Sequence, residues 1–306
     1  MNMTYDDHNP AGAAPARARS EDASGELGPP PMEPVASEPQ DLPGFPSPPQ
    51  VPRISDDLRV PWDWTDVLLF LVFGIAASVA ITWGLAQVTI KFFGANAGDV
   101  FGNSMNTTKS VVVLISQAVF DAAAIVYLYL MLLARTPAPF WRSIGWRQMR
   151  SGQGTVRASA IHYLAGGAML ALVVTFAGAF FNSKETLPIE QLLQARISMM
   201  LFAVLGVLVA PLVEETIFRG FLYPVIARRL GIVAGVAITG TLFGLTHAAQ
   251  LWGGWGQIAL LIFVGIVLTW VRARTGTVAA SYFVHLGYNG LQLLGYVFYV
   301  IGASRH

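Results

Sequence analysis

Seven apolar runs follow one another along most of this chain, and they constrain its fold more than any other feature. The runs lie at about residues 65–90, 108–134, 158–181, 197–223, 231–250, 257–271 and 277–301. A helix of about 20 apolar residues crosses a bilayer. Hydrophobic residues form 54% of the chain and charged residues only 12%, whereas a soluble domain has about a quarter charged residues. The sequence therefore predicts an all-α, polytopic transmembrane helical bundle of about seven to eight spans.

The first 60 residues differ from the rest of the chain. They contain 12 of its 18 prolines, many Ala, Ser and acidic residues, and almost no aromatic residues. Such a segment buries too little apolar surface to offset the entropy lost on folding. We therefore predict two regions, a disordered Pro-rich tail over residues 1–60 and a transmembrane domain over residues 61–306.

The arginines outside the apolar runs predict the orientation of the bundle. Five of them and no acidic residue lie between the second and third runs, and two further pairs follow the fourth and sixth runs. These residues are Arg135, Arg142, Arg147, Arg150, Arg157, Arg228, Arg229, Arg272 and Arg274. Loops rich in Lys and Arg stay in the cytoplasm. We expect a multi-pass protein of the cell (plasma) membrane with a cytoplasmic N-terminus. The formal net charge is only +1, so no nucleic-acid partner is expected.

The stretch from Glu214 to Arg219 is the strongest candidate for a functional site. It places two adjacent glutamates and an arginine inside an apolar run, where an ionisable group is costly unless it is paired or faces a polar cavity. Glu215 and Arg219 are four residues apart, so they share a helix face and can pair. Glu214 is turned by about 100° from Glu215 and can face a cavity. Pro211 removes a backbone hydrogen bond and predicts a kink just before these residues.

Three polar side chains on later runs are expected at the depth of the glutamates. Counted from the turn after the fourth run, Glu214 and His247 both lie about 21–23 Å along their helices. Counted from the start of the last run, His285 and Asn289 lie about 16 and 22 Å along it. Four polar groups from three runs therefore converge on one layer of the bundle. This convergence favours a catalytic site over isolated packed residues.

Other protease chemistries fit the sequence less well. The chain has no cysteine and therefore no thiol nucleophile, and it has no Gly-x-Ser-x-Gly turn. Asp121 is the one further acid inside an apolar run, and it lacks a second aspartate with which to share a proton. We interpret Asp121 as a partner of Gln117 that faces the bundle.

Three motifs in this order resemble those of one protease family. They are Glu-Glu-x-x-x-Arg at 214–219, Phe-x-x-x-His at 243–247 and His-x-x-x-Asn at 285–289. Over about residues 160–300 the chain resembles the CAAX-protease and bacteriocin-processing family (CPBP, or Abi), which includes the type II CAAX prenyl endopeptidases. The resemblance implies an intramembrane endopeptidase whose partners are membrane lipid and a membrane-associated peptide or protein substrate, such as a prenylated protein or a small peptide.

The resemblance also implies a role for each polar residue. Glu214 is the general base that activates water, and His247 shares or orients that water. His285 and Asn289 bind the developing oxyanion or help to position the water.

The resemblance also concerns the pair of Glu215 and Arg219 and the use of a metal cofactor. Glu215 pairs with Arg219 and holds the shape of the site. The family has been described both as metal-dependent and as metal-free glutamate proteases. A divalent metal such as zinc would be bound by Glu214, His247 and His285 with one open position. Because the chain has no His-Glu-x-x-His motif, we favour water activation without a cofactor.

Two other classes of function remain open from the sequence. A catalytically silent immunity or scaffold protein would keep the fold and bind a peptide or protein partner, and the tail of residues 1–60 would suit tethering. A transporter would use the buried Glu and His side chains to relay protons, although no inverted repeat is evident.

Overall fold

The computed structural model describes residues 56–102, 105–149, 156–181, 188–193 and 196–303. Most of the tail that the sequence predicts, residues 1–55, lies outside the described residues. Residues 52–306 form one compact unit.

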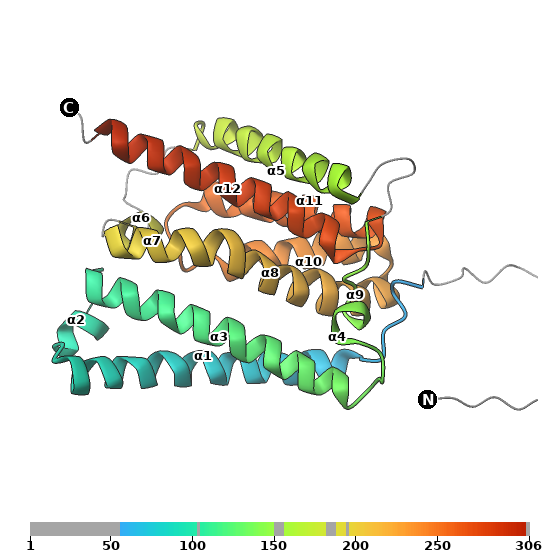
Figure 1. Ribbon diagram of the computed structural model, residues 1–306, viewed down its shortest axis with the longest axis horizontal. Helices are drawn as coiled ribbons and strands as arrows, with labels where there is room; N and C mark the ends of the chain where they lie inside the picture. The colour runs from blue at the N-terminus through green and yellow to red at the C-terminus, as the bar shows by residue number, and fades with distance from the viewer. Residues whose placement is uncertain (1–55, 103–104, 150–155, 182–187, 194–195, 304–306) are drawn as a thin grey trace, which may run out of the picture. The chain divides into compact units, whose positions relative to one another are not determined.

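Helices build this unit, and no strand occurs in the part of the chain that is described. Figure 1 shows the helices running roughly alongside one another. In chain order the elements are α1 (Trp64–Phe93), α2 (Ala97–Phe101), α3 (Thr107–Leu133), α4 (Phe140–Ser143), α5 (Val156–Gly178), α6 (Pro188–Leu192), α7 (Arg196–Val204), η1 (Leu205–Val209), α8 (Ala210–Glu215), η2 (Thr216–Leu222), α9 (Tyr223–Leu230), α10 (Ile232–Thr246), α11 (Trp255–Thr275) and α12 (Val278–Ala303).

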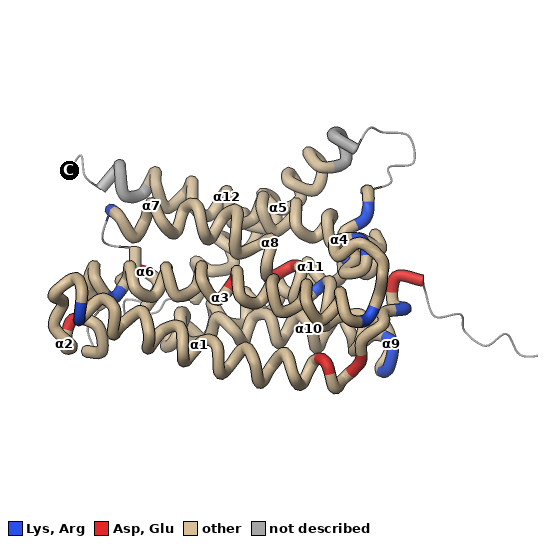
Figure 2. The backbone as a smooth tube through the Cα atoms, turned by 60° about the horizontal axis from the view of Figure 1, so that its bottom comes forward, with Lys and Arg blue, Asp and Glu red and all other residues tan. Residues whose placement is uncertain are grey.

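Five helical stretches among the described residues are long and apolar enough to cross a membrane. They are Trp64–Phe93, Thr107–Leu133, Ala160–Gly178, Arg196–Leu230 and Trp255–Thr275. Of the two remaining predicted runs, one forms the shorter α10, with 15 residues, and the other forms α12, with 26. Figure 2 shows Lys and Arg gathered toward the two ends of the bundle, with long uncharged stretches between them. The predicted all-α transmembrane bundle is confirmed.

The fourth apolar run forms one long helical stretch whose backbone changes pitch twice, at the π-helical segments η1 and η2. In a π-helix the carbonyl of residue i accepts from the N–H of residue i+5. The carbonyl of Gly206 in η1 would need the N–H of Pro211, and proline has none. The side-chain amide of Asn289 in α12 donates to this carbonyl instead, at 2.8 Å. The local change expected at Pro211 thus takes the form of a π-helical segment that another helix completes.

Two helix pairs approach closely because glycines line their contacts. α5 packs on α12, and a Cβ at Gly167 would overlap the carbonyl oxygen of Val284 and lie 2.8 Å from the nitrogen of Tyr288. α10 packs on α11, and a Cβ at Gly240 would lie 2.5 Å from the backbone nitrogen of Ile266. Small residues allow such close backbone approach between membrane helices.

The residues before α1 are bound to one end of the bundle by arginines. Arg228 donates to the carbonyl oxygens of Val60 and Trp62, each at 3.0 Å. Arg272 donates to the Asp57 carboxylate at 2.8 Å. The predicted tail boundary at residue 60 therefore falls inside a segment that packs on the helices.

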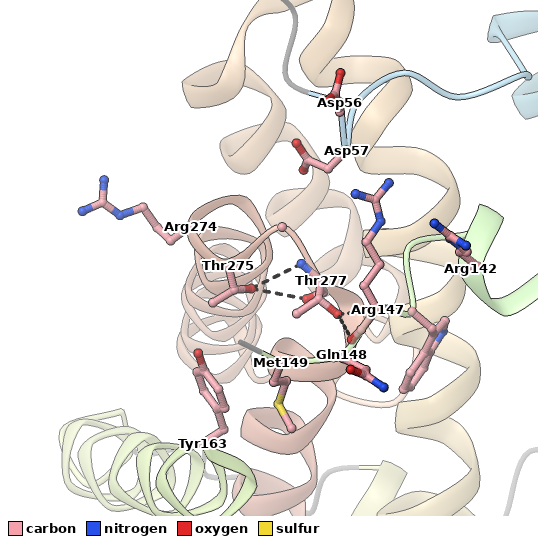
Figure 3. Close-up of a pocket in the computed structure, with 12 residues that line it drawn as sticks. Asp56, Asp57, Arg142, Arg147, Gln148, Met149, Tyr163, Arg274, Thr275 and Thr277 are labelled. Atoms are coloured by element: carbon pink, nitrogen blue, oxygen red, sulfur yellow. Dashed lines mark hydrogen bonds between the residues drawn. The ribbon is translucent and has the colours of Figure 1, made fainter. Parts of the chain in front are cut away.

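The same end contains an open cavity of about 1160 Å³. Figure 3 shows Arg142, Arg147 and Arg274 around it, together with Asp56 and Asp57. Arginines from loops far apart in the sequence therefore lie at one end of the bundle, as the charge pattern predicts.

Candidate active site

The two glutamates of the first motif point in different directions from the end of α8. The Glu215 side chain is fully buried, whereas 21% of the Glu214 side chain is exposed. Adjacent helical residues are turned by about 100° from each other. This rotation lets one carboxylate enter the protein interior while the other meets the histidines.

Arg219 in η2 uses each of its three guanidinium nitrogens. Nη1 donates to Glu215 Oε1 at 2.9 Å, and Nη2 donates to the carbonyl of Gly265 at 2.9 Å. Nε donates to the Thr269 hydroxyl at 3.2 Å. Because the guanidinium is a rigid planar fork, the contacts with Gly265 and Thr269 hold η2 against α11 while the third contact pairs the arginine with Glu215.

Glu215 also orients a histidine. Nδ1 of His285, on α12, lies 3.0 Å from Glu215 Oε1. Since this oxygen accepts hydrogen bonds, Nδ1 carries the proton, and Nε2 of the neutral ring is an acceptor. That Nε2 lies 3.7 Å from Glu214 Oε2.

His247 reaches the other oxygen of the same carboxylate from α10. It is the residue that ends this helix. Its Nδ1 lies 3.0 Å from the carbonyl oxygen of Phe243, so Nδ1 is the donor and Nε2 points away from its own helix. Nε2 lies 3.6 Å from Glu214 Oε1. Two imidazoles from two helices thus face the two oxygens of Glu214.

Phe243 forms the apolar wall behind these groups. Its ring centre lies 5.1 Å from that of His247 and 5.5 Å from that of His285. The Arg219 guanidinium carbon lies 4.5 Å from the same ring centre. Such a cation–π contact favours the arginine in this position. The aromatic residue of the second motif therefore contacts all three charged or polar partners of the glutamates.

Asn289 and Asp121 occupy the edges of this arrangement. The Asn289 amide nitrogen is bound to Gly206, so its described contact joins α12 to η1. Asp121 in α3 is buried and accepts a hydrogen bond from Gln117 at 2.7 Å. Gln117 is thus the partner that the sequence suggests for Asp121.

A metal ion would need three suitable ligands at short range. Zinc binds imidazole and carboxylate at about 2.0–2.2 Å. Among the residues that the structure describes, no group of three His, Asp or Glu side chains is arranged to hold a metal ion. We therefore derive no step through a metal ion.

The structure adds residues that no sequence motif marks. Thr269 and the Gly265 carbonyl on α11 bind Arg219, and the Thr269 hydroxyl donates to Gly265 at 2.7 Å. The Trp146 indole donates to the Thr216 hydroxyl, one residue after the glutamates, at 3.0 Å. The only sequence signal for Thr269 is a hydroxyl inside an apolar run, which is common in membrane helices because the hydroxyl can bond to its own backbone.

Comparison with known proteins agrees with this geometry. Residues 196–291 match the family model described as Rce1-like, type II CAAX prenyl endopeptidase. The matched range contains all three motifs, and with them His247 and His285, which face Glu214. The chain matches no curated protein and no solved structure. The resemblance seen in the motifs is therefore confirmed: residues 196–291 of this multi-pass membrane protein match the Rce1-like model of the type II CAAX prenyl endopeptidase family.

Proposed function

We propose that this protein hydrolyses a peptide bond of a membrane-associated substrate with a water molecule activated by Glu214. One observation carries the proposal. The two oxygens of the Glu214 carboxylate lie 3.6 and 3.7 Å from the Nε2 atoms of His247 and His285. These distances exceed a direct hydrogen bond, and a water molecule beside the three groups can contact a Glu214 oxygen and an Nε2 atom at once.

The protonation of the rings strengthens this argument. Both Nδ1 atoms face oxygen acceptors, so in its neutral form each ring presents Nε2 as an acceptor toward a carboxylate that is also an acceptor. Three acceptors that face one another need a shared donor between them. Water supplies two O–H donors, and their polarisation by Glu214 and an imidazole prepares the oxygen for attack.

The chemical steps then follow from this arrangement. Glu214 takes a proton from the water as the oxygen bonds to the scissile carbonyl carbon. The carbonyl oxygen becomes an oxyanion, which the second N–H of the Asn289 amide stabilises. When the C–N bond breaks, the proton held by Glu214 passes to the leaving amine. Glu215 and Arg219 keep His285 in place throughout.

The proposed substrate class follows from the site and the family. Glu214 and His247 retain 21% exposure each, within a bundle whose outer surface is apolar. We therefore propose that a substrate reaches them from the membrane. The family named in the match acts on CAAX prenyl proteins, so a prenylated C-terminal peptide is the first substrate to test.

Cleavage of a quenched fluorescent peptide that ends in farnesyl-Cys-aliphatic-aliphatic-X tests the proposal. The purified protein in liposomes should release the C-terminal fragment, identified by its mass. Glu214→Gln should lower kcat by about 10²- to 10⁴-fold, the usual contribution of a general base. Glu190→Gln, which changes an exposed glutamate on α6, is the matched control and should retain activity.

Three outcomes would contradict parts of this proposal. Full activity of the Glu214→Gln protein would remove Glu214 from the chemistry. Activity lost with a chelator and restored by zinc would replace metal-free activation with a metal-dependent one. Equal cleavage of the peptide without its farnesyl group would remove prenylation from the substrate class.

We also propose that the arginine-rich end faces the cytoplasm of a cell whose plasma membrane holds the protein. The chain has no cysteine, so a single introduced thiol can be labelled without background. In intact cells a membrane-impermeant maleimide should label Trp252→Cys, in the loop between α10 and α11, and should not label Arg142→Cys. The reverse pattern would invert the proposed orientation.

A further inference from the structure

Asp121 is a buried acid on α3 that the proposed chemistry does not use. Only 3% of the residue is exposed. Its Oδ1 accepts from Gln117, but its Oδ2 is buried and has no hydrogen-bond partner among the described residues. An unsatisfied carboxyl oxygen inside a membrane helix is costly, so the bundle retains it at the expense of stability.

Asp121 is buried on α3, the helix that packs against the segment that carries Glu214. α3 packs against α7, η1 and α8. Asp121 also interacts electrostatically with Glu214 at the end of α8. The histidines approach Glu214 from α10 and α12, so Asp121 adds an acceptor from a different wall of the same site. Figure 2 shows acidic segments of the chain in the middle of the bundle, away from its charged ends.

Gln117 connects this acceptor to the outer surface of α3. Its side chain is exposed, although it lies ten residues into a predicted membrane span that begins at Thr107. An exposed amide at this depth, bonded to a buried carboxyl, forms a polar path from the membrane side of α3 toward Glu214. Such polar groups mark pathways within membrane proteins.

A peptide that is cut inside a membrane needs such an acceptor. The bond under attack must leave the helical conformation, and each freed backbone N–H then requires a partner in a medium without water. The groups assigned to catalysis supply donors for the carbonyl oxygen and a base for water. Their acceptors, the Glu214 carboxylate and the two Nε2 atoms, are assigned to the water, so none of them is assigned to a backbone N–H.

We propose that Asp121, held in place by Gln117, binds the substrate by accepting a backbone N–H next to the scissile bond. This assignment rests on the proposed protease function, and it adds a substrate-binding residue from α3. The carboxyl is a positioning group that contacts substrate without taking part in proton transfer.

The test pairs one protein change with one substrate change. Asp121→Asn keeps the size of the side chain and places a donor where Oδ2 stood. A series of farnesylated peptides replaces one backbone N–H at a time with an ester oxygen, at positions other than the scissile bond. Binding is measured by fluorescence anisotropy on the Glu214→Gln protein, and kcat/KM is measured on the protein with Glu214 intact.

The expected result is a specific coupling. One ester position should weaken binding and lower kcat/KM by about 10-fold on the Asp121 protein, the usual effect of a buried hydrogen bond. The same ester should have no further effect on the Asp121→Asn protein. Each protein serves as its own reference for the amide and ester peptides, so a change in folded fraction cancels. Asp99→Asn, on α2, is the control and should behave like the parent.

Two results would overturn the inference in distinguishable ways. If the parent cleaves the amide peptide and every ester has the same effect with and without the Asp121 carboxyl, Asp121 is only a structural residue. If the parent does not cleave any peptide, the proposed function fails, and the binding measurements alone then show whether Asp121 contacts a peptide backbone.

Discussion

The contact between α5 and α12 offers the sharpest test of how packing supports the site. Gly167 faces α12, and a methyl group there would overlap the Val284 carbonyl and lie 2.8 Å from the Tyr288 nitrogen. Gly166, its neighbour, faces open space, with nothing within 4 Å of an added Cβ. Gly167→Ala and Gly166→Ala therefore make the same chemical change on two faces of one helix.

The expected magnitudes follow from the position of the contact. Both obstructing groups are backbone atoms, so α12 must move to admit the methyl group. Adding a carbon to a tightly packed contact costs about 1–3 kcal/mol of unfolding free energy. Val284 precedes His285, so the same movement displaces an imidazole of the site. A misplacement of about 1 Å can lower activity by about 10²-fold. Gly167→Ala should therefore lose both stability and kcat.

Two measurements on both variants check this reasoning. Unfolding in detergent, followed by tryptophan fluorescence, gives the stability, and cleavage of the farnesylated peptide gives kcat. Gly166→Ala should match the parent in both, and it should gain slightly in stability because alanine favours a helix over glycine. If the two variants behave alike, α5 and α12 do not meet at Gly167 as described.

Three further predictions concern single interactions. Arg219→Met leaves the buried Glu215 carboxylate without its cation and should lower the unfolding free energy by about 3–5 kcal/mol, with much of this recovered when Glu215→Leu is added; a loss below about 1 kcal/mol would deny the pair this role. Asn289→Ala should lower the unfolding free energy by only about 1 kcal/mol, as for other hydrogen bonds between membrane helices. If the amide binds the oxyanion, kcat should fall by far more than the loss of folded protein explains. A fall in kcat that merely follows the loss of folded protein would make Asn289 a structural link. Asp63 is the exposed N-cap of α1, and the Thr65 N–H that donates to it lowers its pKa below the ordinary 3.8. The parent should therefore melt at a higher temperature than Asp63→Asn, by an amount that is constant above pH 3.8 and is lost as the pH falls through the lowered pKa. A difference in melting temperature that stays unchanged at lower pH would contradict the charged cap.

Apolar periodicity and residue spacing accounted for the bundle and for the central contacts of the site. Depth counting works for Glu214 and His247 because a helical hairpin fixes equal rises on both sides of its turn. The spacing of Glu215 and Arg219 predicts their pairing because four residues make about one helical turn.

Other contacts depend on packing that no local pattern encodes. Thr269 meets Arg219 only because α11 lies beside η2. A single hydroxyl in an apolar run does not indicate which side chain it will contact. The second role of Glu215, as the partner of His285, depends on how α12 is rotated. Likewise, the proline in the fourth run predicts a disturbed helix, but not that an asparagine from the last helix would complete it.

The π-helical segments on either side of α8 set a limit on how this span can vary in length. Each segment holds its extra residue within the turn, so removing one residue from η1 would return the backbone to α-helical pitch. That deletion would shorten the span by one residue and change the backbone around Gly206, where Asn289 completes the π-helical turn. Among related proteins, insertions and deletions should therefore accumulate in the loops. The number of residues in the fourth span should stay fixed even where its apolar side chains are substituted.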